Sequence, residues 1–433
     1  MKKSFLNDLL RVGTSNMLSI IVGLCTSIIT ARYLGPENNG LITGLTIFPS
    51  IFMSVGSLGI RQSTTFFLGK GIYEEGKIKT AIAQIWALTS IISIIICFIL
   101  IYYFSRSGQN LLWVLLAIIP IPFSLFNTYN SGIYLGKNEI GAFNKINWIP
   151  TFIVFIVTSL FLIVLKMDVT GYMIALISGP VLMFILLLFK NKFIQSLSFS
   201  FDFKIIKVML SLGAVYAVSL LVITLNYRVD VIILDKLSTP YQLGIYSKGV
   251  VITQYLWQIP MVMSTIVFAR SAISKNGIEF SYKISQLLRL SLLAIGLISI
   301  VLFVLSDFII TTMYGQEFCG SINVLKILLP GVVILTLFKV MNMDLAGKGK
   351  PWISMKAMIP GLIINIILNI ILIPKYGANG ASFSSTISYG IAGILFIYFY
   401  SLETSIPIKE IITYKKTDFD PIKNIIKKIY KKR

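Results

Sequence analysis

The sequence predicts an all-α polytopic membrane protein with twelve transmembrane helices in two six-helix lobes. Three observations predict this fold class. Of the 433 residues, 56% are hydrophobic and only 13% are charged, which is more apolar surface than one soluble core can bury. The apolar residues gather in runs of about 20, the length of helix that crosses a bilayer. Basic residues gather in alternate loops between these runs.

A window of about 19 residues finds six apolar runs before the basic loop near residue 200 and six after it. The runs of the first half cover about 12–31, 41–60, 80–104, 111–135, 146–165 and 170–189. Those of the second half cover about 208–227, 242–268, 287–310, 323–345, 353–373 and 380–400. The predicted domains are an N-terminal lobe over 1–200, a C-terminal lobe over 201–402 and a basic cytoplasmic tail over 403–433.

The basic residues predict the orientation. The N-terminus, alternate loops and the tail hold 29 of the 38 lysines and arginines, whereas the opposite loops hold eight. Because cytoplasmic loops carry the excess of positive charge, both termini of this multi-pass protein are expected to be cytoplasmic. The first run lacks a small-residue cleavage site and is expected to be a retained helix rather than a signal peptide.

The tail ends in DPIKNIIKKIYKKR, which begins at Asp420. Its isoleucines fall on one helical face and its lysines on the other, which is typical of an amphipathic helix lying on a membrane surface that contains anionic lipid. A frayed basic tail is the alternative.

The composition lacks residues and motifs that several classes of function require. The chain has no histidine, so the commonest general base and metal ligand are absent, and we expect no enzyme activity, metal or cofactor. Cys25, Cys97 and Cys319 have no CxxC spacing and are expected to be small buried hydrophobes. No GxxxxGK[ST] loop for ATP occurs. The net charge of +21 is attributed to membrane-facing loops, and no nucleic acid partner is expected.

The second half repeats features of the first. Gly136-Lys137 is followed by Lys145 and by Ile149-Pro150, and Gly347-Lys348 is followed by Lys356 and by Ile359-Pro360. Lys166 precedes Gly171 as Lys375 precedes Gly380, and the segment 36–40 has a counterpart in 240–244. Because each half contains an even number of spans, the repeats are expected to be parallel, related by a pseudo-two-fold axis along the membrane normal, with substrate between the lobes.

Three segments carry a family resemblance: TARYLGPENNGLITGL at 30–45, RVDVIILDKLSTPYQLGIYSKG at 228–249, and AGKGKP with NIILNIILIPKYGANGAS at 346–351 and 365–382. Together they resemble the bacterial polysaccharide repeat-unit flippases. These are the O-antigen and capsule translocases of the multidrug/oligosaccharidyl-lipid/polysaccharide exporter superfamily. The resemblance covers essentially the whole chain. It implies a cargo of oligosaccharide on a polyprenyl pyrophosphate, turned from the inner to the outer leaflet for surface polysaccharide assembly.

Such a cargo needs a wet, cationic cavity between the lobes, open sideways for the lipid tail. A Lys or Arg at a helix centre costs about 2.5 to 3.5 kcal/mol, so each intramembrane cation is a candidate for substrate binding. Lys339, in ILTLFKVMNMDLAG, is the leading one. Contact with phosphate or glycan, a structural ion pair and snorkelling to the interface are the three interpretations of it.

Arg228 and Asp230 end the seventh predicted span and point to different sides of a helix. Arg228 is a second candidate for substrate binding. Asp230 is the leading carboxylate for a coupling H⁺ or Na⁺, and Asp344 is a further candidate for coupling or gating. A structural or interfacial role is the alternative for Asp230.

Arg32, Arg61 and Lys248 lie at the ends of predicted spans. By resemblance, an arginine near the first helix reads substrate phosphate, and Arg32 is where this chain offers one. Membrane-interface anchoring is the alternative for all three.

Two other functions compete with the flippase. A cation-coupled multidrug or toxin extruder would share the fold but is expected to line its cavity with carboxylates. A glycan polymerase or ligase would need a large outer loop, and all predicted outer loops are short. The expected partners are the lipid-linked oligosaccharide, membrane lipid and a polysaccharide polymerase, with H⁺, Na⁺ or the membrane potential for coupling. The identity of the glycan is not encoded in any motif.

Overall fold

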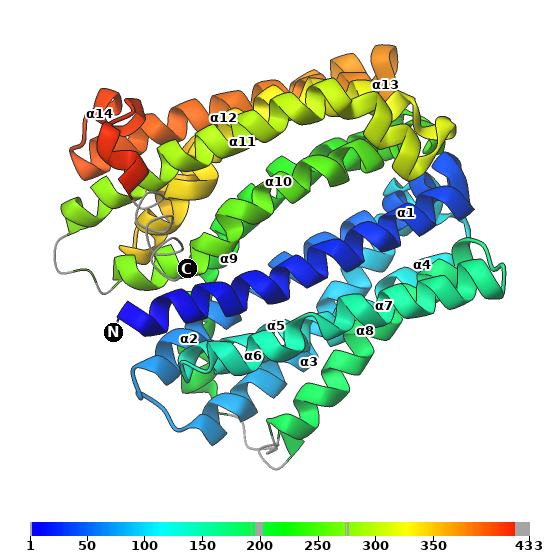
Figure 1. Cartoon of the computed structure of the whole chain (residues 1–433). Coiled ribbons are helices and arrows are strands. Elements are labelled where there is room, and N and C mark those ends of the chain that lie inside the picture. The colour runs from blue at the N-terminus through cyan, green and yellow to red at the C-terminus, as the bar shows by residue number, and fades with distance from the viewer. Residues whose placement is uncertain (1, 192, 195–201, 273, 275–276, 421–433) are drawn as a thin grey trace, which may run out of the picture.

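The computed structural model describes residues 2–191, 193–194, 202–272, 274 and 277–420. Among these residues all regular structure is helical, which confirms the all-α fold class. Nine helical segments in the described residues are long and apolar enough to cross a membrane. Most helices run roughly along one direction, and α1 begins at the same end of the molecule at which α14 lies (Figure 1).

The N-terminal half contains eight α-helices and two short segments of tighter or wider pitch. They are α1 (Lys2–Val55), α2 (Ile60–Gly69), α3 (Glu75–Phe104), the 3-10 turn η1 (Arg106–Gln109), α4 (Leu111–Ile118), α5 (Pro120–Gly136), α6 (Ile140–Asn147), α7 (Ile149–Ser159), the π-helical turn η2 (Leu160–Val164) and α8 (Val169–Lys190).

The C-terminal half has fewer and longer helices. They are α9 (Phe203–Leu237), α10 (Pro240–Ala272), α11 (Gly277–Tyr314), the 3-10 turn η4 (Gln316–Phe318), α12 (Gly320–Gly347), α13 (Trp352–Thr404), α14 (Ile408–Ile412) and the 3-10 turn η5 (Lys416–Phe419).

The two longest helices, α1 and α13, each contain two helices joined at a kink. The backbone leaves the helical region at Gly35, with φ 69° and ψ 177°, and at Gly377, with φ 53° and ψ −127°. Both values of φ are positive, a region that glycine enters without the steric cost that a Cβ brings. Both kinks fall between two predicted spans. The total of twelve spans and the pseudo-two-fold relation stay predictions.

Other helix boundaries differ from the predicted spans. The second predicted span ends near residue 60, but the structure breaks it at 56–59 and continues it as α2 to Gly69. The fourth is broken before Pro120 into α4 and α5, and the fifth is broken before Ile149-Pro150 into α6 and α7. A proline has no N–H to donate and clashes with the preceding turn, so it ends or bends a helix at these points.

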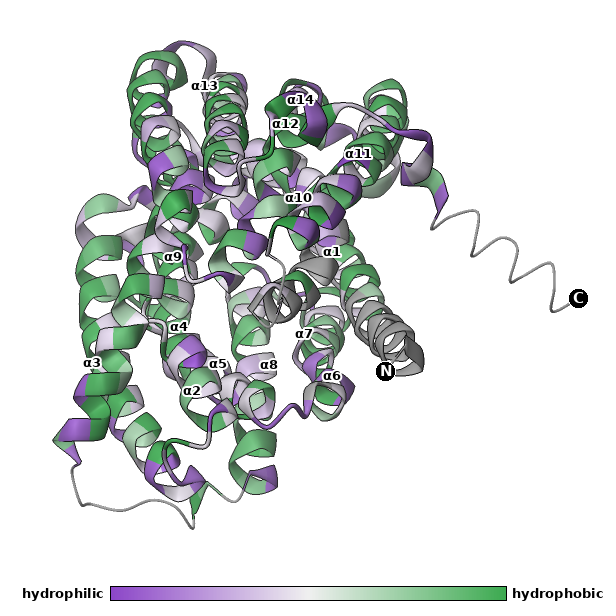
Figure 2. Ribbon diagram, turned by 90° about the vertical axis from the view of Figure 1, so that its left-hand side faces the viewer, coloured by the Kyte–Doolittle hydropathy of each residue, from purple (hydrophilic) through white to green (hydrophobic). Residues whose placement is uncertain are grey.

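The buried core is in two clusters. The larger one runs from the kink of α1 through α9, α10, α12 and α13, and therefore joins the two halves of the chain. The smaller one lies between α2, α3, α5 and α8 and includes Ile205 and Met209 of α9. Apolar residues predominate along most of the helices (Figure 2). On α3 and α11, Tyr103, Val304 and Phe308 are each about 70% exposed, as expected for a lipid-facing surface.

The first part of the predicted tail is packed on the protein. Ile406 and Ile411 are fully buried, and Arg289 of α11 binds Asp418 through two hydrogen bonds of 2.7 and 2.6 Å. We call residues 405–419 the C-terminal strap. The amphipathic helix predicted after Asp420 and the lobe boundary predicted at 200 both lie outside the described residues.

Candidate functional site

A cavity of about 620 Å³ lies between the N-terminal helices and α10. Both limbs of α1 line it, together with α4, α5, α7, α8 and one face of α10. Along α10 the lining extends from Ser247 to Gln258, or about 17 Å at roughly 1.5 Å per residue. The lining therefore comes mostly from the N-terminal half, and α10 contributes one wall from the C-terminal half.

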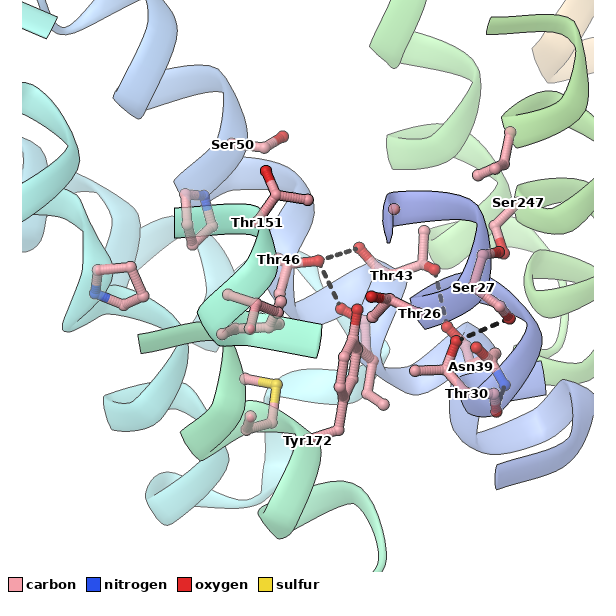
Figure 3. Close-up of a pocket in the computed structure, with 18 of the residues that line it drawn as sticks. Thr26, Ser27, Thr30, Asn39, Thr43, Thr46, Ser50, Thr151, Tyr172 and Ser247 are labelled. Atoms are coloured by element: carbon pink, nitrogen blue, oxygen red, sulfur yellow. Dashed lines mark hydrogen bonds between the residues drawn. The ribbon is translucent and has the colours of Figure 1, made fainter. Parts of the chain in front are cut away.

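Most of the polar lining is uncharged. It consists of hydroxyls and amides from Thr26, Ser27, Thr30, Asn39, Thr43, Thr46, Ser50, Ser124, Thr151, Tyr172, Ser247, Gln254, Tyr255 and Gln258 (Figure 3). Several of these hydroxyls donate to carbonyls of their own helix, as Thr43 does to Asn39, Thr46 to Ile42 and Ser50 to Ile47, each at 2.7 Å. Their oxygens can still accept hydrogen bonds from a ligand.

Asn39 holds the kink of α1 at one end of the cavity. Its side-chain amide donates to the carbonyl oxygens of Thr30 at 2.8 Å and Gly35 at 2.6 Å. Because Thr30 lies before the kink, Gly35 lies at it and Asn39 lies after it, this side chain ties the two limbs of α1 together.

Lys248 is the one charged residue among the described residues that line the cavity. It projects from α10 toward the first limb of α1, where its ammonium donates to Thr30 Oγ1 at 2.8 Å and to the Ser27 carbonyl at 3.1 Å. The residue is 6% exposed, and no carboxylate lies within 4.0 Å of it in the described part of the chain. A buried cation without a counterion is a strong attractor for an anionic ligand.

Arg228 and Asp230 lie on α9, outside the set of residues that line the cavity. Asp230 is fully buried. It accepts hydrogen bonds from Tyr246 of α10 and, at 2.7 Å, from Ser385 of α13. Arg228 is half-buried. In the described structure it forms no ion pair with Asp230, which lies two positions further along α9 and therefore points to a different side of the helix.

Lys339 lies in an aromatic cage within the C-terminal half. Its ammonium is 4.0 Å from the ring centre of Tyr227 and 4.6 Å from that of Trp257. Tyr389 packs on both rings, at 5.9 and 5.6 Å. The cage therefore joins α9, α10, α12 and α13, and the cation is held by the ring quadrupoles. In the described structure it does not line the cavity or pair with a carboxylate.

Asp344 is at the centre of a saturated hydrogen-bond network. It accepts from Ser271 at 2.6 Å, Ser281 at 2.7 Å and Tyr400 at 2.7 Å, and it forms an ion pair with Lys348 at 2.9 Å. These partners come from α10, α11, α13 and α12 itself. A carboxylate with four partners is suited to fixing helices rather than to receiving a ligand.

The two remaining arginines are away from the cavity lining. Arg32 is exposed and donates through Nε to the Met313 carbonyl at 3.0 Å, at the end of α11. Arg61 is half-buried in α2, and its backbone lies against Gly132 of α5. Of the five cations predicted to bind substrate, Lys248 alone lines this cavity.

Sequence reasoning missed most of the polar lining, including Gln254 and Gln258. Both are amides one helical turn apart in an otherwise apolar run, and this spacing on one helix face was available as a signal. The hydroxyls of the first span were visible in the sequence but could not be assigned to the cavity without the partner helices.

Comparison with known proteins identifies the family. A sequence model of the polysaccharide biosynthesis protein family matches residues 5–272, which is more than half of the chain. The chain belongs to this family. It is therefore a multi-pass membrane protein of polysaccharide biosynthesis, as the sequence resemblance implies.

Two curated relatives agree with this family. The probable low-salt glycan biosynthesis flippase Agl15 of Haloferax volcanii is 28% identical over 24% of this chain and 22% of its own length. The capsular polysaccharide biosynthesis protein CapF of Staphylococcus aureus is 26% identical over 41% of this chain and 46% of its own length. The chain therefore aligns with less than half of either relative.

Solved structures confirm the fold of the exporter superfamily. The lipid II flippase MurJ in an inward closed conformation superposes with a TM-score of 0.76 and 18% identity, over 92% of this chain and 88% of that one. An inward-facing multidrug resistance transporter of the MATE family superposes with a TM-score of 0.73 and 15% identity, over 93% of this chain and 99% of that one. At this level of identity the likeness establishes the fold alone.

Proposed function

We propose that this protein is an alternating-access flippase for a polyprenyl-pyrophosphate-linked oligosaccharide repeat unit. It moves the cargo from the cytoplasmic to the outer leaflet of the bacterial cytoplasmic membrane, for assembly of a surface polysaccharide such as O-antigen or capsule. The family and the flippase and capsule names of its relatives support this proposal.

The observation that carries the proposal is the chemistry of the cavity. A glycan presents hydroxyls, and the lining offers hydroxyls and amides that accept and donate hydrogen bonds. A pyrophosphate presents negative charge, and the buried lining cation is Lys248. The described lining contains no carboxylate, which disfavours the cationic drugs of the competing extruder function.

The remaining predicted residues take other roles in this proposal. Asp230, held by Tyr246 and Ser385, is the candidate carboxylate for a coupling H⁺ or Na⁺. Lys339 and Asp344 hold the helices of the C-terminal half together. Both chain termini are proposed to be cytoplasmic, and a polysaccharide polymerase is the proposed recipient of the flipped repeat unit.

The test uses proteoliposomes that contain the purified protein and a pyrophosphate-linked oligosaccharide lipid. Flipping is measured as the fraction of glycan that a membrane-impermeant lectin reaches over time. Removing a charge-assisted hydrogen bond costs about 1.5 to 3 kcal/mol, so Lys248→Met is expected to slow flipping by about 10- to 100-fold. Lys248→Arg keeps the charge and is expected to retain part of the rate.

Lys236→Met is the matched control, because Lys236 is an exposed cation in the same half of the chain. This substitution is expected to leave the rate of flipping unchanged. Flipping at the full rate by Lys248→Met would remove the observation on which the proposal depends. Efflux of a cationic dye by vesicles that leave the glycan lipid in place would establish the extruder instead.

A further inference from the structure

The end of the molecule at which α1 kinks is closed by contacts that run from one half of the chain to the other. Two exposed arginines of the N-terminal half, one carboxylate of the C-terminal half and a pair of glycines make these contacts. We call this set the outer clasp: Arg32, Arg106, Asp235, Gly40 and Gly244. Positive-charge counting predicts that this end faces outward.

Each arginine of the outer clasp binds the C-terminal end of a helix in the other half. Arg32 donates to the Thr312 and Met313 carbonyls in the last turn of α11. Arg106 donates through Nη1 at 2.6 Å to the carbonyl of Ser238, the residue that caps the C-terminal end of α9. The last carbonyls of a helix have no intrahelical partner and carry the negative end of its dipole, so they attract a guanidinium.

Asp235 makes the converse contact. It lies one turn before Ser238 on α9, and its carboxylate accepts from Ser107 Oγ at 3.4 Å, next to Arg106. Arg106 of the N-terminal half thus binds the end of α9. One turn earlier on the same helix, Asp235 binds Ser107, the neighbour of Arg106.

The glycines form a reciprocal contact. A Cβ on Gly40 would overlap the carbonyl oxygen of Pro240, and a Cβ on Gly244 would overlap that of Pro36. These residues belong to the two segments, 36–40 and 240–244, that the sequence identifies as internal repeats. The first residue of each segment thus contacts the last residue of the other segment. A two-fold axis between the segments produces this reciprocal arrangement.

We propose that Arg32 and Arg106 are gate residues that close the cavity at this end and do not bind the cargo. The proposal rests on the alternating-access function above. Neither arginine lines the cavity, both are exposed, and the hydrogen bonds of both guanidinium groups in the described structure go to carbonyls of the opposite half. For the cavity to open at this end, every contact of the outer clasp has to break.

Exposed charged contacts of this kind are individually weak, so each one adjusts the balance between closed and open states without locking it. Both arginine side chains are exposed, and the buried Asp235 carboxylate beside Arg106 keeps its hydrogen bond from Ser107 when Arg106 is replaced. Variants at both positions are therefore expected to fold and insert in normal amounts, which the yield of membrane-inserted protein checks.

The test measures how readily the cavity is reached from outside. Cys25, Cys97 and Cys319 are replaced by serine, and one cysteine is introduced in the cavity as Ser50→Cys. Intact cells receive a membrane-impermeant maleimide, and the rate of labelling is recorded. Arg32→Ala or Arg106→Ala is expected to raise this rate by about two- to fivefold, the change expected from losing one exposed charged contact. The double variant is expected to exceed either one.

Lys326→Ala is the matched control. Lys326 is a partly exposed cation whose partner, Asp307 at 3.0 Å, belongs to the same half of the chain, so its loss is expected to leave labelling unchanged. Arg32→Lys keeps the charge without the planar fork and is expected to give an intermediate rate.

The outcomes separate this proposal from the proposed function. Unchanged labelling in both arginine variants and in the double variant overturns the gate assignment, and loss of glycan flipping in the same variants would then make them cargo contacts. Faster labelling together with an absence of flipping by the parent protein supports the gate and overturns the flippase.

Discussion

Lys248 and Lys339 show two ways in which a membrane-embedded chain keeps a cation without a carboxylate. Lys248 is satisfied by hydroxyl and carbonyl oxygens of α1 and lines the cavity. Lys339 is satisfied by the rings of Tyr227 and Trp257. Both lysines stand out in the sequence, since a cation in an apolar run is costly. The sequence ranks Lys339 first, because the rings that surround it come from other helices and no spacing along the chain reveals them.

The cage predicts a structural effect for Lys339. A desolvated cation–π interaction contributes about 2 kcal/mol, so Lys339→Met is expected to lower the free energy of unfolding by about 1 to 2 kcal/mol. Thermal unfolding of the detergent-purified protein measures this change. A double-mutant cycle with Trp257→Leu is expected to give a coupling energy of about 1 kcal/mol.

Lys356→Met provides the matched control, because Lys356 lies 4.6 Å from the ring centre of Trp352, a residue that is 40% exposed. An exposed cation–π pair contributes about 0.5 to 1 kcal/mol, so the control is expected to have the smaller effect. A Lys339→Met protein of unaltered stability that no longer flips glycan lipid would instead support the cargo contact that the sequence predicts.

At the scale of helices, the sequence marks the two long kinked helices as separate apolar runs and misses the break at 56–59. The turns before Pro36 and at Pro374-Lys375-Tyr376-Gly377 were visible as breaks in apolar runs. The break at 56–59 lies in Gly-Ser-Leu-Gly, which is nearly as apolar as its surroundings. Tertiary packing against α9, where Gly59 meets the Gly213 backbone, determines it.

The kink of α1 predicts a role for Asn39. Replacing it by leucine keeps the approximate size but leaves the carbonyls of Thr30 and Gly35 without their donor. Losing a buried hydrogen-bond partner costs about 1 to 3 kcal/mol, so Asn39→Leu is expected to lower thermal stability accordingly. Asn38→Leu is the control, because the side chain of Asn38 makes no hydrogen bond within the described structure. An equal loss of thermal stability in the two variants would contradict the role of Asn39 in tying the two limbs of α1 together.

The C-terminal strap predicts an acid-sensitive element. The Arg289 guanidinium holds the pKa of Asp418 below its usual range. A carboxylate with a depressed pKa stabilises the folded strap fully above its unfolded value of about 3.9, and this contribution is lost as pH falls below that value. Hydrogen exchange of residues 405–419 is therefore expected to be independent of pH near neutrality and to accelerate in acid.

Asp418→Asn is expected to expose the strap at neutral pH. Breaking a buried ion pair costs about 3 to 5 kcal/mol, and the pair is nearly inaccessible, with side chains 5% and 1% exposed. Glu410→Gln is the control, since Glu410 faces Lys415 at 4.0 Å on the surface. Protection of the strap in Asp418→Asn equal to that in the parent would show that the buried isoleucines hold it without the ion pair.

At the scale of the whole molecule, the proposed cargo carries about two negative charges through a cavity with one buried cation. When the cytoplasm is electrically negative, moving two negative charges out of it is favourable by about 4.6 kcal/mol per 100 mV, at about 2.3 kcal/mol per charge. A potential imposed on the proteoliposomes is therefore expected to enrich the glycan lipid in the leaflet on the positive side, and reversing the potential is expected to reverse the enrichment.

If the distribution of the glycan lipid does not depend on the potential but follows a Na⁺ or H⁺ gradient, a titratable or ion-binding group couples transport to that gradient. Asp230→Asn would then be expected to abolish the dependence on the gradient, because Asp230 is the carboxylate held between α9, α10 and α13.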